Sequence, residues 1–162
     1  MKNVGFHQRN ELGLKNAYKS KKKIYIDNDK MFLAGTSNLQ DVWDDLKIPL
    51  NLTRFSKRYQ DADNLLKENP QVKKIVGHSL SGAVGLELQK RHPNKDFDIT
   101  TYGAPVVQVG GQKYKRFRKS GDLISGLDDG AITYEGSMNP LKAHSYTGYN
   151  YFFIFIYFDL LI

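Results

Sequence analysis

Residues 73–90 read KKIVGHSLSGAVGLELQK, and this stretch decides the fold. Two lysines, an isoleucine and a valine begin it like a strand, and its last eleven residues have the pattern of a helix. The small residues between them, Gly77, Ser79, Ser81 and Gly82, allow a strand to turn sharply into a helix. Such a turn leaves Ser79 on a strained, exposed elbow, where the unpaired N–H groups of the helix favour negative charge. The stretch therefore predicts Ser79 as a nucleophile.

The same small residues can also serve only to pack a helix closely against a strand. Ser81 is a second serine in the turn, but it is the weaker nucleophile candidate because Ser79, and no glycine, stands two residues before it. A suitable base and acid elsewhere in the chain would favour the catalytic interpretation over the packing one.

The histidines narrow the choice of a general base. In α/β-hydrolases the triad follows the chain order serine, acid, histidine. Of His7, His78, His92 and His144, only the last two follow Ser79. His92 ends the predicted helix, where a cationic residue has an ordinary capping role. His144 lies in a polar, turn-rich stretch and is the predicted base.

The acid must lie between the helix and His144. Asp122 follows a strand-like run and a Ser-Gly turn, so that it stands at the carboxyl end of a strand, where it can reach a histidine ring. Its competitors lie in a turn, at the wrong end of a strand, or elsewhere in the loops: Asp128, Asp129, Asp96, Asp98 and Glu135. Asp122 is the predicted acid.

With these residues in place, the chain resembles the class three (fungal-type) lipases over about residues 24–149. Five stretches carry the resemblance, in the family's order. They are 31–36 (MFLAGT) with Asp41 and Asp45, 77–83 (GHSLSGA), 100–106 (TTYGAPV), 121–124 (GDLI), and His144 with Tyr146.

The resemblance implies a fold, an activity and a site. The fold is α/β-hydrolase-like, a compact single domain with a mostly parallel sheet and helices on both faces. The activity is that of a serine ester hydrolase on lipids, without a cofactor or metal. Ser79, Asp122 and His144 would form the triad, and Thr36 with the backbone N–H of Leu80 the oxyanion hole. An inactive lipase-fold module that binds lipid is the alternative, favoured by Ala34 and Ser81, where the family has Arg and Gly.

A chain of 162 residues is long enough for one domain with a single hydrophobic core, and the sequence has no internal repeat. The chain divides into a basic segment (1–23), the lipase-like domain (24–149) and an apolar tail (150–162). Strands are expected at 24–26, 31–34, 73–76, 97–102, 113–118 and 131–134, and helices at 38–46, 53–68 and 80–90. Alternation of strands and helices in the middle of the chain predicts a parallel sheet. The short connection at 47–52 predicts an open acyl groove.

The composition indicates where the protein is located and what it binds. There is no cysteine, and the first twenty residues lack the apolar region of a signal peptide, which favours an intracellular or virion-associated protein. The net charge of +7 is concentrated at Lys19 to Lys23 and at Lys113 to Lys119. These runs predict an anionic membrane surface as a partner. The second run leads directly to Asp122 and should lie near the mouth of the site. Nucleic acid is the weaker prediction because no binding motif accompanies the charge. The sequence does not indicate an oligomeric state.

Overall fold

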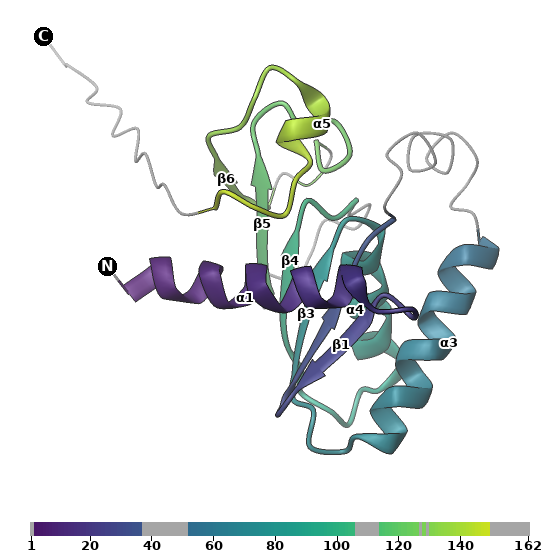
Figure 1. Cartoon of the computed structure of the whole chain (residues 1–162). Helices are drawn as coiled ribbons and strands as arrows, with labels where there is room; N and C mark the ends of the chain where they lie inside the picture. The colour runs from purple at the N-terminus through teal and green to yellow at the C-terminus, as the bar shows by residue number, and fades with distance from the viewer. Residues whose placement is uncertain (1, 37–51, 106–113, 127, 129, 150–162) are drawn as a thin grey trace, which may run out of the picture.

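Six strands form one sheet in chain order (Figure 1). The computed structural model describes residues 2–36, 52–105, 114–126, 128 and 130–149. The strands are β1 (Ile24–Asp27), β2 (Lys30–Leu33), β3 (Lys74–His78), β4 (Asp98–Tyr102), β5 (Lys115–Lys119) and β6 (Ile132–Tyr134). β1 and β2 are antiparallel, and each later neighbouring pair is parallel. The predicted α/β class with a mostly parallel sheet is confirmed.

Local chemistry explains the connections. A tight turn joins β1 to β2, with Asn28 at φ 52°, a conformation that asparagine tolerates better than most residues. Parallel neighbours need a crossover. The helix α3 (Leu52–Glu68) supplies one before β3, and α4 (Leu80–Arg91) supplies the next before β4. The predicted helix at 38–46, the connection at 47–51 and the tail at 150–162 lie outside the described residues.

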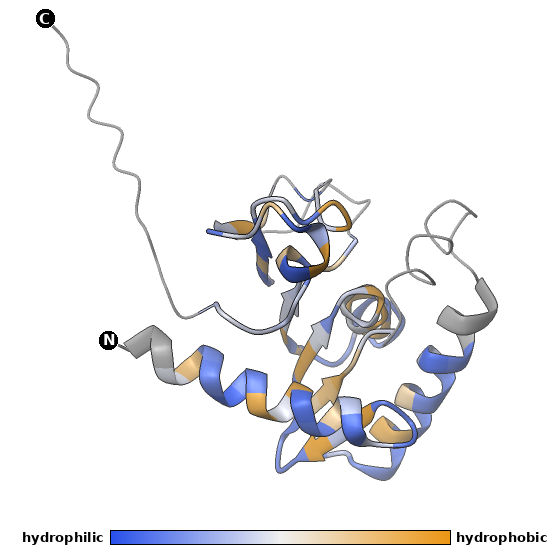
Figure 2. Cartoon of the chain, turned by 45° about the horizontal axis from the view of Figure 1, so that its top comes forward, coloured by the Kyte–Doolittle hydropathy of each residue, from blue (hydrophilic) through white to orange (hydrophobic). Residues whose placement is uncertain are grey.

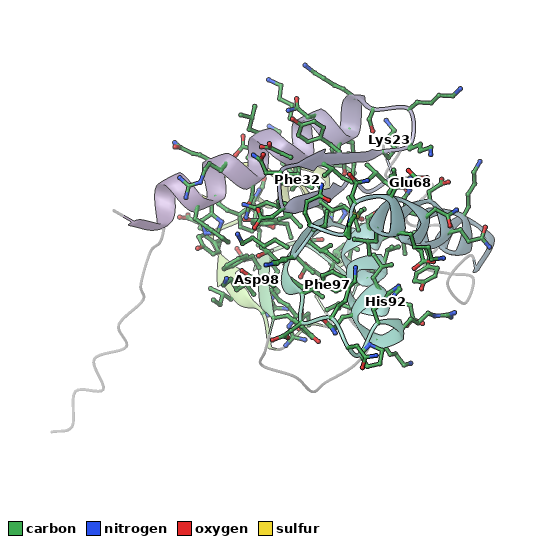
Figure 3. All side chains as sticks on the ribbon, turned by 90° about the horizontal axis from the view of Figure 1, so that it is seen from below. Lys23, Phe32, Glu68, His92, Phe97 and Asp98 are labelled. Carbon is green, nitrogen blue, oxygen red and sulfur yellow. The ribbon has the colours of Figure 1, made fainter. Side chains whose placement is uncertain are left out.

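The sheet is covered on both faces, as predicted. Side chains alternate along β2, so that Met31 and Leu33 join the core under α3 and α4 while Phe32 and Ala34 join a second core under α1 (Lys2–Lys19). Figure 2 shows the apolar residues gathered on the strands and the helix surfaces that face them. In Figure 3, Phe32 lies directly against α1.

The helix α1 was not foreseen, since the sequence analysis assigned residues 1–23 only a basic character. Leu14 and Ala17 are fully buried against the sheet, but two polar residues, His7 and Asn10, also face inward. The His7 ring contacts the hydroxyls of Tyr102 and Tyr134, at 2.9 Å each. This inward polar pair interrupts the apolar stripe by which an amphipathic helix is recognised in a sequence.

Burial of His7 gives the fold a dependence on pH. Desolvation lowers the pKa of His7 below its ordinary value of 6.5. Below pH 6.5 the unfolded chain therefore binds a proton that the folded chain does not, and the free energy of unfolding falls as the pH drops toward the folded pKa. The loss is at most ~1.4 kcal/mol per pH unit for one such group.

We expect His7→Gln to lessen this acid destabilisation, because glutamine does not titrate. Urea unfolding of both proteins at about pH 7.5 and about pH 5 measures it, as the difference between the two losses. An equal loss in His7→Gln and in the parent chain would show that His7 has no part in it.

Candidate active site

Ser79 occupies a strained turn between β3 and α4. Its φ of 56° and ψ of −138° lie in a region that non-glycine residues avoid. The turn is held by hydrogen bonds from Ser79 N–H to the Tyr102 carbonyl (2.9 Å) and from Gly82 N–H to the Ser79 carbonyl (2.8 Å). Gly77 permits the close approach of the helix, since a Cβ there would lie 2.6 Å from Gly82 Cα. The predicted elbow is thus present.

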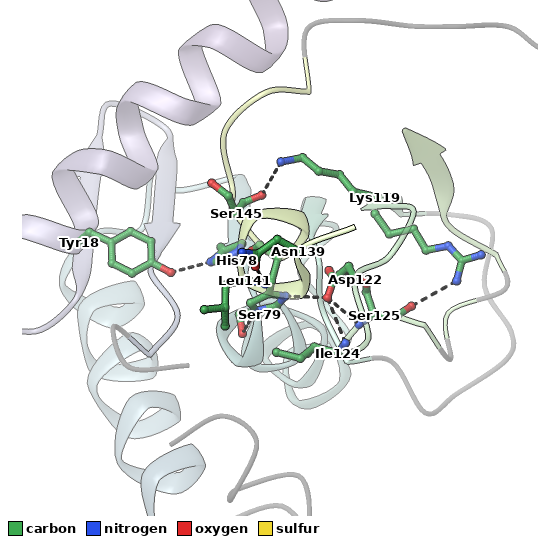
Figure 4. A network of polar contacts seen from close by, with 12 residues as sticks. Tyr18, His78, Ser79, Lys119, Asp122, Ile124, Ser125, Asn139, Leu141 and Ser145 are labelled. Carbon is green, nitrogen blue, oxygen red and sulfur yellow. Dashed lines mark hydrogen bonds and ion pairs between the residues drawn. The ribbon is translucent and has the colours of Figure 1, made fainter. Parts of the chain in front are cut away.

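A chain of hydrogen bonds joins Ser79 to a histidine and a carboxylate (Figure 4). Ser79 Oγ lies 2.8 Å from His144 Nε2, and His144 Nδ1 lies 2.9 Å from Asp122 Oδ1. An ionised carboxylate only accepts, so His144 carries its proton on Nδ1 and can accept the serine proton at Nε2. The structure brings together the three residues that the sequence singled out, in the arrangement of a nucleophile, base and acid.

The Asp122 carboxylate is buried and fully engaged. Oδ1 accepts from the Ile124 N–H (3.0 Å) as well as from His144, and Oδ2 accepts from Ser125 Oγ (2.6 Å). Burial alone raises the pKa of Asp122, but these hydrogen bonds and the nearby His144 outweigh it, so that the pKa lies below its ordinary value. Asp122 is therefore ionised, as a residue that orients His144 must be.

A short helix, α5 (Pro140–Ala143), delivers His144 to this position. It begins with Asn139, whose side chain accepts from the Leu141 N–H at 2.9 Å, and it has proline in its first turn. The His144 N–H bonds to the Pro140 carbonyl (2.9 Å). The sequence analysis treated this stretch as a loop, because a single helical turn leaves no periodicity to detect.

The competing candidates lie elsewhere. His92 contacts Asp63 at 2.6 Å, Asp98 pairs with Lys115, and Asp128 pairs with Arg116 at 3.4 Å. Asp96 and Glu135 are exposed, and Asp129 lies outside the described residues. The structure does not connect the described competitors to Ser79.

The segment after β2 borders Ser79. A Cβ on Gly35 would lie 2.8 Å from Ser79 Cβ. The Ala34 N–H bonds to the Lys23 carbonyl (2.9 Å), and the Gly35 N–H bonds to the Tyr18 hydroxyl (3.1 Å). The next N–H along the chain is that of Thr36, which is half-buried. Thr36 therefore directly follows a residue whose backbone borders Ser79.

Leu80 is expected to supply the second backbone N–H of the oxyanion hole. It is the first residue of α4, and the first N–H groups of a helix have no acceptor within the helix. Ser79 makes no capping hydrogen bond through its side chain, because its Oγ is bonded to His144 instead. The structure thus places Leu80 directly after Ser79, and Thr36 directly after Gly35, whose backbone borders Ser79.

Ala34 and Ser81, the two departures from the family pattern, are in contact with each other. Ser81 Oγ donates to the Ala34 carbonyl (2.7 Å) and accepts from Arg58 Nη1 (3.2 Å). Arg58 Nη1 also donates to the Ala34 carbonyl. A guanidinium from α3 thus lies at the strand end where the family pattern has an arginine within the strand. Sequence reasoning missed Arg58 because nothing in an exposed-looking helical turn marks it.

Ser79 is more enclosed than the sequence suggested. Ser79 was expected on an exposed elbow, yet it is only 1% exposed. The reason is local, since its Oγ is capped by the His144 ring and its Cβ lies against the Gly35 backbone. Asp122 and His144 are each 4% exposed. The expected exposure of Ser79 was therefore wrong.

Two basic residues of β5 are internal, while Lys115 is exposed and Arg118 half-buried. Arg116 and Lys119 are buried. Lys119 Nζ donates to the carbonyls of Ser145 (3.0 Å) and Thr147, just after His144, and lies 4.8 Å from the centre of the Tyr149 ring. Lys119 therefore fastens the loop that carries His144 to the sheet. Sequence alone showed only its charge.

The described residues hold neither a cluster of metal ligands nor a membrane-crossing helix. Their His, Asp and Glu side chains form no group of three that could hold a metal ion. Within the same ranges, no helix has the length and apolar character needed to cross a membrane.

Comparison with known proteins leaves the family open. No family model matches the chain, and no curated protein matches it. The solved structure of the Lip2 lipase from Yarrowia lipolytica is similar at 17% identity with a TM-score of 0.41. The similarity covers 68% of this chain and 58% of the length of the lipase. At this level it carries no argument about function, which has to come from the residues of the chain itself.

Gly103 gives a direct test of the acid–base contact. It has φ +56°, and a Cβ there would lie 2.9 Å from Asp122 Oδ2 and 3.3 Å from His144 Nδ1. We expect Gly103→Ala to separate the two side chains, and the downfield proton NMR signal of the His144 Nδ1–H to disappear. Gly126→Ala is the matched control, since its Cβ would meet nothing closer than 3.5 Å in the adjacent loop. A signal that survives in Gly103→Ala would contradict the contact.

Proposed function

We propose that this chain is a serine ester hydrolase of the lipase, phospholipase or esterase type, which cleaves carboxylic esters through an acyl-enzyme. The observation that carries the proposal is the unbroken hydrogen-bond chain from Ser79 through His144 to Asp122 on a strained strand–helix turn. Strained backbone conformations of this kind are concentrated at active sites, where they position reactive groups.

The reaction would begin with attack of Ser79 Oγ on the ester carbonyl as its proton passes to His144 Nε2. Asp122 stabilises the resulting imidazolium without taking its proton. The oxyanion would be bound by the backbone N–H groups of Thr36 and Leu80, with the Thr36 hydroxyl as a further donor. Collapse expels the alcohol, protonated by His144. Water, deprotonated by His144, then attacks the acyl group, and the acid leaves as Ser79 regains its proton.

We expect Ser79→Ala to abolish both ester hydrolysis and covalent labelling by a fluorophosphonate, without loss of the fold. Asp122→Asn should lower turnover by about 10⁴, as in serine proteases, because His144 would adopt the wrong tautomer. Asp98→Asn removes an exposed carboxylate and is the control, with turnover unchanged. Hydrolysis that persists in Ser79→Ala, measured with a soluble short-chain ester, would exclude Ser79 as the nucleophile.

An inactive lipid-binding module remains the alternative function. The close cover of Ser79 and the substitutions at Ala34 and Ser81 are the observations in its favour. The two functions differ in one measurement, because only an activated serine reacts covalently with a fluorophosphonate. A chain that binds lipid but is not labelled would be such a module.

The surroundings of the site favour a lipid surface as the source of substrate. β1 is antiparallel to β2, with Ile24 opposite Leu33, so the turn before β1 lies at the same sheet edge as Ser79. Lys19, at the end of α1, and Lys21 and Lys22, in this turn, are exposed. They would attract anionic headgroups, each by ~1 kcal/mol.

Apolar side chains are exposed at the same edge. Leu123, Met138 and Leu141 are 59%, 103% and 53% exposed. Leu123 follows Asp122, and Met138 and Leu141 precede His144. The two segments are in contact, since a Cβ on Gly121 would lie 2.5 Å from the Ser137 carbonyl oxygen. Exposed leucine and methionine at the same end of the strands as exposed lysines suit an anionic lipid surface better than nucleic acid. Because Arg116 and Lys119 of β5 are buried, this partner is proposed mainly on the lysines at 19–23.

We expect Lys21→Glu/Lys22→Glu to weaken binding to phosphatidylserine vesicles by at least ~30-fold, because two attractive charges of ~1 kcal/mol each are lost. Lys73→Glu/Lys90→Glu makes the same charge change at exposed positions at the opposite edge, near the start of β3 and the end of α4, and should bind as the parent chain does. Sedimentation with vesicles at low and high salt measures both. Equal weakening by the two pairs would point to net charge alone.

A further inference from the structure

The hydroxyl of Tyr18, in the last turn of α1, joins three parts of the site. It lies 2.6 Å from His78 Nδ1 and accepts from the Gly35 N–H at 3.1 Å. The other ring nitrogen of His78, Nε2, lies 2.7 Å from the carbonyl oxygen of His144 (Figure 4). One phenol thus connects the segment that leads to Thr36, the residue before the nucleophile and the backbone of the base.

The protons along this chain have one consistent arrangement. The His144 carbonyl can only accept, so His78 must carry a proton on Nε2. Burial, with the nearby His144, lowers the pKa of His78 to about 3, so the ring is neutral and its Nδ1 accepts. The single proton of Tyr18 therefore goes to His78. Burial raises the pKa of Tyr18, which keeps that proton in place.

We propose that Tyr18 and His78 are positioning residues for the hydrolysis, an inference that rests on the proposed function. Gly35 cannot turn its N–H elsewhere without losing the Tyr18 hydroxyl, and it precedes Thr36. His144 is held at both ends, by Asp122 through its ring and by His78 through its carbonyl. A displacement of 1 Å at such a site can cost ~10²-fold in rate.

The Tyr18 ring is held by contacts that do not involve its hydroxyl, so the hydroxyl can be removed without displacing the ring. It stacks on Tyr146, with ring centres 5.0 Å apart and planes 16° apart. Lys23 Nζ donates to the Tyr18 carbonyl (2.6 Å). The helix is also anchored at a distance through His7. Phenylalanine at position 18 would therefore keep the helix docked and remove only the two hydrogen bonds.

The test compares Tyr18→Phe with Tyr134→Phe. The control also removes a phenol hydroxyl bonded to a histidine, at His7 on α1, but its hydrogen bond reaches none of Gly35, Ser79 and His144. With a soluble short-chain ester, we expect kcat to fall about 10- to 100-fold in Tyr18→Phe with KM within about twofold of the parent chain, and no such fall in the control. His78→Gln should add little to the loss in Tyr18→Phe, because both interrupt one chain.

Turnover in Tyr18→Phe within about twofold of the control, or losses that simply add with His78→Gln, would overturn the proposal. An inactive parent chain would instead refute the proposed function. The positioning is then tested by the NMR signal of the His144 Nδ1–H, which Tyr18→Phe must shift or broaden and Tyr134→Phe must not. An unchanged signal overturns it. Should Tyr18→Phe not fold, His78→Gln alone carries the same comparison.

Discussion

The sharp turn at Ser79 is the constraint on which the rest of the structure depends. A non-glycine residue at φ 56° and ψ −138° costs about 1–3 kcal/mol, and it persists only when its surroundings determine it. Here β4 accepts its N–H, the first turn of α4 binds its carbonyl, and Gly77 lets the helix come within contact distance. A looser approach of helix and strand would release the strain and turn Oγ away from His144. The parallel pairing of β3 with β4 is therefore as necessary to the site as its polar side chains are.

Burial of polar groups extends this constraint outward. A buried polar group without a partner costs about 1–3 kcal/mol, so each group around Ser79 is held where its partner is. Asp122 is engaged by His144, Ser125 and Ile124. The carbonyls after His144 are bound by Lys119, and the carbonyl of His144 itself by His78. The site is thus held together by hydrogen bonding as well as by apolar packing.

The positive charge of the chain has two different uses in the fold. Within β5, Arg116 and Lys119 lie in the interior, where Arg116 pairs with Asp128 and Lys119 donates to loop carbonyls. In the turn before β1 the lysines remain in solvent. A run of basic residues reads alike in both places, because charge in a sequence does not show which side of an element is covered.

The sequence by itself determined most of the elements and singled out the three residues that meet at Ser79. Hydrophobic period and turn residues are local, and they sufficed for six strands, for α3 and α4, and for the elbow at Ser79. The chain order of serine, acid and histidine pointed to Asp122 and His144 among several candidates. The tertiary structure alone decided that α1 covers a face of the sheet, that Tyr18 meets His78, and that Ser81 meets Ala34 and Arg58. These contacts join residues 60, 47 and 23 positions apart. No local pattern encodes them, because each depends on how crossovers bring distant segments to one edge of the sheet.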